Sequence, residues 1–179
     1  MRKAAHKTEV IETYFEKFWV MVAEKSIYKN DIYNFDEMGF RIRCARDVLV
    51  ITYSTKSQVY TADPNNWELI TAVECISTRG FAIEPMLVMS SKTYLKKAFN
   101  NNLHNEIFIS LSNIGYSNEV LGMYWLRHFN TQTLAQRQSI WRLLIFDSHI
   151  SYLSYEFVSF CEAQNIVPFC LLLHSTHLL

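Results

Sequence analysis

The hydrophobic positions of this chain follow two different periods, and each period predicts one kind of secondary structure. Between residues 8 and 25, apolar side chains recur every three or four positions, which is the spacing of one face of an α-helix. Shorter runs that are rich in β-branched and aromatic residues, and bounded by turn-forming residues, are typical of strands. The pattern therefore predicts a chain of mixed α and β elements.

The order of these elements narrows the fold. Predicted helices span residues 8–25, 117–131 and 154–164, and predicted strands span residues 32–36, 47–53, 67–77, 83–90, 106–111, 140–146 and 166–173. The first strand and the hairpin that turns at residues 78–80 are expected to form three antiparallel strands. The run 140–146 is apolar apart from Arg142, which is typical of a strand buried on both faces in a parallel pairing. Three antiparallel strands, a helix, a buried strand, a helix and another strand make a mixed α/β sheet in the order of a ribonuclease H-like fold.

Two of the strands deliver an aspartate where they end. Asp36 closes the strand 32–36, and Asp147 follows the strand 140–146. If these strands lie side by side, the two carboxylates come within a few ångströms and repel each other, so such a site usually holds a divalent cation. Two carboxylates that bind Mg²⁺ are the working part of many phosphoryl-transfer and nuclease sites. The plainer alternative is that each aspartate caps a turn.

Four segments carry a resemblance to a known family. Residues 34–40 (Asn-Phe-Asp-Glu-Met-Gly-Phe) resemble the N-x-D-E-T-G-F segment of pogo-type transposases, which are DDE superfamily endonucleases, and residues 143–149 resemble the family's L-L-L-D-G-H segment. Residues 116–129 are similar to its T-x-x-x-x-x-x-W-L-x-x-F helix, and residues 174–179 match its H-S-T-H-L-L segment. The order and spacing agree from about residue 31 to residue 179, and four matches in order are specific.

The resemblance implies a site and a set of partners. It implies a ribonuclease H-like domain over residues 31–179, after an N-terminal amphipathic helix and linker over residues 1–30. It implies that Asp36 and Asp147 are the first two catalytic acids and metal ligands, that Mg²⁺ or Mn²⁺ is the cofactor, that DNA is the partner and that the protein works in the nucleus. Glu37 is expected to face away from Asp36 and to be structural.

The resemblance also predicts what this chain lacks. The family's third acid lies in a Q-P-L-D segment that would follow residue 179, so we expect a C-terminally incomplete domain without catalytic competence. Met38 stands where the family has a threonine, and Ser148 where it has a glycine. The alternatives are a domesticated, non-catalytic module that binds DNA or protein, and the product of a pseudogene.

Composition sets further limits. With 179 residues, of which half are hydrophobic, the chain is expected to form one domain with a packed core. Lysine plus arginine equal aspartate plus glutamate at 17 each, and this neutrality counts against the segment being the main DNA anchor. The longest apolar run, residues 169–173, is too short to span a membrane.

The remaining candidate residues are open to two interpretations each. The apolar stripe of the first helix is expected to pack on the domain, and a dimer or interdomain contact is the alternative. His174 and His177 have a spacing that suggests zinc, but no cysteine or aspartate pair accompanies them, and the resemblance places them in the loop before the third acid. His149 is expected to be a surface or packed histidine, with a contact to DNA as the alternative.

Overall fold

The computed structural model describes residues 8–42, 68–93, 107–147 and 154–171. In chain order the elements are α1 (Thr8–Glu24), the short 3₁₀ helix η1 (Lys29–Asp31), β1 (Ile32–Ile42), β2 (Glu68–Ser77), β3 (Met86–Ser90), β4 (Phe108–Ser112), α2 (Glu119–Leu134), β5 (Arg142–Phe146), α3 (Tyr155–Ala163) and β6 (Ile166–Cys170). The strand predicted at residues 47–53 lies outside the described residues.

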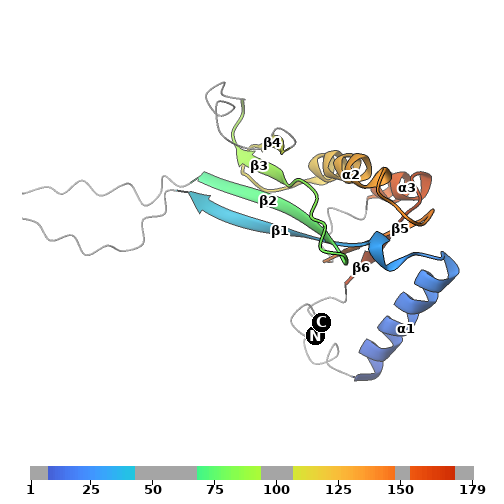
Figure 1. Cartoon of the computed structure of the whole chain (residues 1–179). Helices are drawn as coiled ribbons and strands as arrows, with labels where there is room; N and C mark the ends of the chain where they lie inside the picture. The colour runs from blue at the N-terminus through green and yellow to red at the C-terminus, as the bar shows by residue number, and fades with distance from the viewer. Residues whose placement is uncertain (1–7, 43–67, 94–106, 148–153, 172–179) are drawn as a thin grey trace, which may run out of the picture.

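The strands form one six-stranded sheet in the order β4-β3-β2-β1-β5-β6 (Figure 1). β1, β2 and β3 are antiparallel neighbours, whereas β5 runs parallel to both β1 and β6, and β4 runs parallel to β3. The predicted mixed α/β sheet is therefore confirmed. Among the described helices, none combines the length and the apolar character that a membrane crossing requires.

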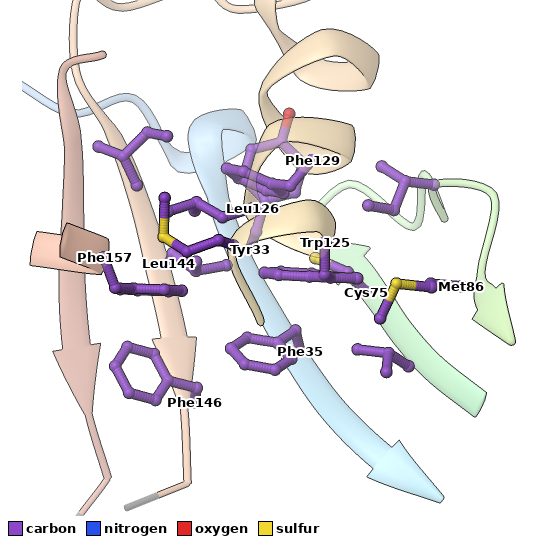
Figure 2. Close-up of a cluster of buried hydrophobic side chains, with 14 of the residues drawn as sticks. Tyr33, Phe35, Cys75, Met86, Trp125, Leu126, Phe129, Leu144, Phe146 and Phe157 are labelled. Atoms are coloured by element: carbon purple, nitrogen blue, oxygen red, sulfur yellow. The ribbon is translucent and has the colours of Figure 1, made fainter. Parts of the chain in front are cut away.

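Helices α2 and α3 cover one face of the sheet. The core on this face joins side chains from both helices to alternate residues of β1, β2 and β5 (Figure 2). Phe35 of β1 stacks on Trp125 of α2, with ring centroids 4.2 Å apart, and Trp125 also stacks on Phe129 at 5.6 Å. All three aromatic rings are buried. This face carries the largest part of the apolar burial, and Phe35 is the residue that immediately precedes Asp36.

Helix α1 packs on the opposite face, over β5 and β6. Leu143 belongs to the cluster beneath α1, whereas the next residue, Leu144, belongs to the cluster beneath α2 and α3. Since successive side chains of a strand point to opposite faces, β5 is covered on both sides, as its continuous apolar run predicted. Phe18 of α1 meets Phe169 of β6 edge-on, with centroids 5.3 Å apart. Part of the apolar stripe of α1, namely Tyr14, Phe18 and Val22, thus contacts the sheet, as expected. Phe15 and Trp19 of the same stripe are exposed.

One predicted boundary differs from the structure at the candidate site. β1 continues six residues beyond the predicted end at Asp36, to Ile42, because it pairs antiparallel with β2 over the whole stretch from Tyr33 to Ile42. Its parallel pairing with β5 stops much earlier, at Asn34. Asp36 therefore lies within a strand, two residues past the point where β1 and β5 cease to pair.

Candidate active site

β1 presents Asp36 beside a firmly packed neighbour. Phe35 is 3% exposed under α2, whereas Asp36 is exposed. By strand alternation, Asp36 shares a face with Asn34, and Phe35 and Glu37 point to the other face. The Asp36 carboxylate accepts a hydrogen bond from the Glu37 amide at 2.8 Å. The buried aromatic ring thus fixes the backbone that carries the exposed carboxylate.

β5 brings Asp147 to the same level of the sheet. The parallel register pairs Ile32 with Leu143 and Asn34 with Ile145. The same register, carried two residues further along each chain, sets Asp36 level with Asp147. Asp147 is exposed and directly follows buried Phe146, whose ring lies 5.6 Å from that of Phe35.

Asp147 also influences a thiol on the neighbouring strand. Cys170 of β6 is the register partner of Phe146. Burial, and after it the charge of Asp147, raises the pKa of the Cys170 thiol. The negative charge at residue 147 therefore lies close enough to the end of β6 to disfavour a second negative charge there.

The two aspartates line one cavity. Its volume is about 290 Å³, and the residues around it are Phe35, Asp36, Glu37, Gly39, Thr71, Tyr116 and Asp147. Asp36 also lines a second cavity of about 390 Å³ together with Asn34 and Glu74. The prediction that the strands before Asp36 and Asp147 are parallel neighbours is confirmed. Both aspartates line the same cavity.

Glu37 lines the same cavity as the two aspartates, but it points to the other face of β1. Its carboxylate accepts a hydrogen bond from the Ser117 hydroxyl at 2.8 Å. Ser117 lies just before α2, so this bond ties the approach to α2 to β1. A similar tie joins the Thr71 hydroxyl of β2 to the Gly115 carbonyl at 2.8 Å. The sequence did not single out Thr71, Tyr116 or the bond between Ser117 and Glu37, because no local pattern links residues so far apart.

The donor set suits a hard cation. Carboxylate oxygens are the protein ligands that Mg²⁺ and Mn²⁺ prefer, and Asp36 and Asp147 supply them at one cavity. Within the described residues, no three side chains of histidine, cysteine, aspartate or glutamate come together as a metal site. His149, His174 and His177 lie outside the described residues.

Comparison with known proteins places the chain in a family. The model of the DDE superfamily endonucleases matches residues 66–179. The chain belongs to this family. Asp147 lies inside the matched range, and Asp36 lies before it. This family and the mixed sheet agree with the resemblance drawn from the sequence.

Solved structures show a similar fold. The Mos1 transposase paired-end complex with the left transposon end is 14% identical to this chain, with a TM-score of 0.51. The similarity covers 88% of this chain and 40% of the Mos1 chain. A Mos1 mariner paired-end complex with Mn is 15% identical and covers the same shares, with a TM-score of 0.49. The first similarity confirms the predicted ribonuclease H-like fold for this DDE endonuclease domain.

A curated relative is similar over most of the chain. The protein named MFS-type transporter clz9, from Cochliobolus lunatus, is 32% identical over 158 residues, which make up 88% of this chain. The chain spans 17% of that relative's length. The part of this relative that is similar to the chain is therefore a small fraction of the relative's own length.

Proposed function

We propose that this DDE domain is the catalytic core of a pogo-like transposase, in which Asp36 and Asp147 hold Mg²⁺ or Mn²⁺ against a DNA phosphodiester. The observation that carries the proposal is that Asp36 and Asp147, carried by the parallel neighbours β1 and β5, line one cavity. The resemblance of residues 34–40 and 143–149 to the pogo-type segments supports the same two residues.

The chemistry follows from what these side chains can do. Two carboxylates near a phosphodiester would repel it, so they serve the reaction by binding cations. When bound, a divalent ion activates an attacking oxygen and stabilises the charge on the leaving oxygen. The chain's own contribution is to hold the two carboxylates in place, which buried Phe35 and Phe146 do from the neighbouring positions.

DNA is the proposed substrate, and the nucleus the proposed location. The Mos1 transposase structure with a TM-score of 0.51 is a complex with the left transposon end, which supports DNA as the partner of this chain. The zero net charge of the whole chain indicates that tight DNA binding depends on surfaces other than this domain. We therefore expect the domain alone to bind DNA weakly, with the shallow salt dependence of a surface that makes few phosphate contacts.

We further propose that this chain binds metal without cleaving DNA. Two-metal catalysis needs ligands for both ions. The described residues bring the carboxylates of Asp36 and Asp147 to the cavity, together with that of Glu37, which already accepts a hydrogen bond from Ser117. A domesticated binding module has the same expected behaviour, so cleavage is the readout that separates an enzyme from such a module.

The first test is stabilisation by Mn²⁺. A ligand that binds only the folded state stabilises it, by about 1.4 kcal/mol at ten times the dissociation constant, or roughly 3–6 °C in melting temperature for a chain of this size. We expect this rise in the wild type and its loss in Asp147→Asn. Glu162→Gln is the matched control, because this exposed α3 carboxylate lines neither cavity. An equal rise in Asp147→Asn would show that the ions bind elsewhere.

The second readout uses the same proteins on supercoiled plasmid with Mn²⁺. We expect no nicking above the level of Asp36→Ala. Nicking that disappears in Asp36→Ala would show that the chain is an active nuclease and would refute the proposed lack of cleavage, while leaving the assignment of Asp36 intact.

A further inference from the structure

A second, buried aspartate lies at the other end of β1. Asp31 is the last residue of η1, and its side chain is 0% exposed. The backbone N–H of Gln138 donates to both carboxylate oxygens, at 3.1 Å to Oδ1 and 2.9 Å to Oδ2. The backbone N–H and the hydroxyl of Ser139 both donate to Oδ2, each at 2.5 Å. Gln138 and Ser139 belong to the connection between α2 and β5. One carboxylate therefore joins the residue before β1 to the segment that leads into β5.

Neighbouring contacts strengthen the same junction. The Asn30 amide group donates to the Gln138 side-chain oxygen at 3.0 Å, and the Tyr28 amide donates to the Ser139 hydroxyl at 3.2 Å. The Ser139 hydroxyl has a single hydrogen, which it shares between Asp31 and the Trp141 carbonyl at 2.7 Å. The backbone amides are thus the constant donors to Asp31, and they fix the backbone just ahead of β5.

The pairing of β1 with β5 needs such a constraint. The two strands pair only from Ile32 to Asn34, opposite Leu143 to Ile145. After Arg142, β5 is apolar on both faces, so a slip by one residue would still bury the apolar side chains of residues 143–146 on each side. A hydrophobic pattern specifies register only where one face of a strand is polar. The apolar pattern of β5 therefore does not set its register alone, and long-range hydrogen bonds are needed as well: those of Arg142 to α2 and α3 at the start of β5, and those of Asp31 just ahead of it.

We infer that Asp31 is a positioning residue that sets this register and thereby holds Asp36 level with Asp147. Asp31 precedes Asp36 by five residues, about 17 Å along a strand, so it acts through β1 and not by contact with the site. A slip of one residue would move Asp147 by about 3.3 Å and turn its side chain to the other face. This role rests on the proposed function of Asp36 and Asp147.

An aspartate suits this position better than its isostere. An ionised carboxylate only accepts hydrogen bonds, and Asp31 meets three donors. Oδ2 accepts from all three donors, and Oδ1 accepts from the Gln138 N–H as well. In Asp31→Asn, the amide nitrogen would replace one of these oxygens, so the negative charge would be lost and a new N–H would point at the Gln138 N–H. The substitution keeps the size of the side chain, so its effect reports the hydrogen bonds and not a cavity.

The test compares Asp31→Asn with Val88→Ala. Val88 is fully buried in β3, which is separated from β5 by β2 and β1, so its truncation destabilises the fold away from the junction. Mn²⁺ affinity is measured by calorimetry at a temperature where circular dichroism shows each variant folded. Hydrogen exchange of the β1 and β5 peptides is followed in parallel.

We expect Asp31→Asn to weaken Mn²⁺ binding by up to about tenfold, which is the lower end of what loss of a residue in direct contact with a metal ligand costs, and to speed exchange in β1 and β5. Val88→Ala should bind Mn²⁺ like the wild type. Ser139→Ala removes one donor and keeps the amides, so it should fall between them, and it replaces Asp31→Asn if that variant does not fold. Equal affinity in the wild type and in the Asp31 or Ser139 variant would overturn the positioning role alone. No Mn²⁺ binding by the wild type would overturn the proposed function and this role with it.

Discussion

Arg142 offers the sharpest test of how the fold is held together. It is the one charged residue in the apolar run of β5, and it is 0% exposed. Its guanidinium donates to the Thr133 hydroxyl at 2.6 Å, to the Asn130 side-chain oxygen at 2.6 Å and to the Gln164 carbonyl at 2.9 Å. One side chain thus joins the C-terminal ends of α2 and α3 to the start of β5.

The charge of Arg142 persists at neutral pH. Burial, and then the nearby charge of Arg137, lowers the pKa of Arg142 to about 10. The guanidinium remains protonated at pH 7 and keeps all its donors. Its position at the ends of two helices is favourable, because helix C-termini carry unpaired carbonyls and partial negative charge.

We predict that Arg142→Met lowers the free energy of unfolding by about 3–5 kcal/mol, because truncation leaves buried acceptors without donors. For a chain of this length, this corresponds to a fall in melting temperature of roughly 10 °C. Arg142→Lys should lose about as much, since a single ammonium cannot reproduce the planar fork that reaches two helices. Urea unfolding followed by circular dichroism measures both changes.

Arg137→Ala is the matched control for this experiment. Arg137 is exposed, and its contact to the Ile140 carbonyl is long, at 3.4 Å. Its removal should change stability by no more than about 0.5 kcal/mol. If Arg142→Met is as stable as the wild type to within about 1 kcal/mol, apolar packing outweighs the helix-end bonds, and the reasoning is wrong.

Two further predictions concern a turn and the alkaline pH range. Gly115 has φ +76°, and a Cβ there would lie 2.5 Å from the Leu69 carbonyl oxygen, whereas Gly80 has φ +83° with open space around it. Gly115→Ala should therefore lose about 1–3 kcal/mol more stability in urea unfolding than Gly80→Ala, and equal losses would contradict the close packing. Burial raises the pKa of Cys161 from about 9 to about 12, so the folded state disfavours the thiolate. The stability that this thiol contributes is fully present below pH 9 and is lost as the pH rises toward 12, by up to about 1.4 kcal/mol per pH unit. The free energy of unfolding measured against pH checks this, and the same slope in Cys161→Ala as in the wild type would count against this cause.

The local elements could be predicted from the sequence because their causes are local. The apolar spacing of residues 8–25 predicted α1, and the run 140–146 predicted a strand buried on both faces. Asp36 and Asp147 were candidates because each stands at the end of a short apolar strand, and because residues 34–40 and 143–149 resemble the pogo-type segments. Each of these inferences depends on neighbours within a few positions of the chain, where side-chain period decides which face is apolar.

The continuation of β1 could not be predicted in the same way. The sequence suggested a strand that ends at Asp36, and β1 extends to Ile42 because β2 pairs with it along that length. A strand is completed by hydrogen bonds to a partner, so its end depends on where the partner ends. Here the partner begins at Glu68, beyond a long stretch of intervening chain.

Asp31 and Arg142 are the clearest cases in which only the tertiary structure decides. By sequence, the first is one polar residue before a strand and the second is an interruption in an apolar run. Asp31 accepts a hydrogen bond from the backbone amide of Gln138, 107 positions away, and Arg142 donates to the carbonyl of Gln164, 22 positions away. A buried charge is tolerated only where donors or acceptors converge on it, and that convergence exists only once α2, β5 and α3 are packed against β1. The sequence by itself determined which strands carry the candidate carboxylates, whereas the pairing of β1 with β5 in the folded sheet brought both aspartates to one cavity.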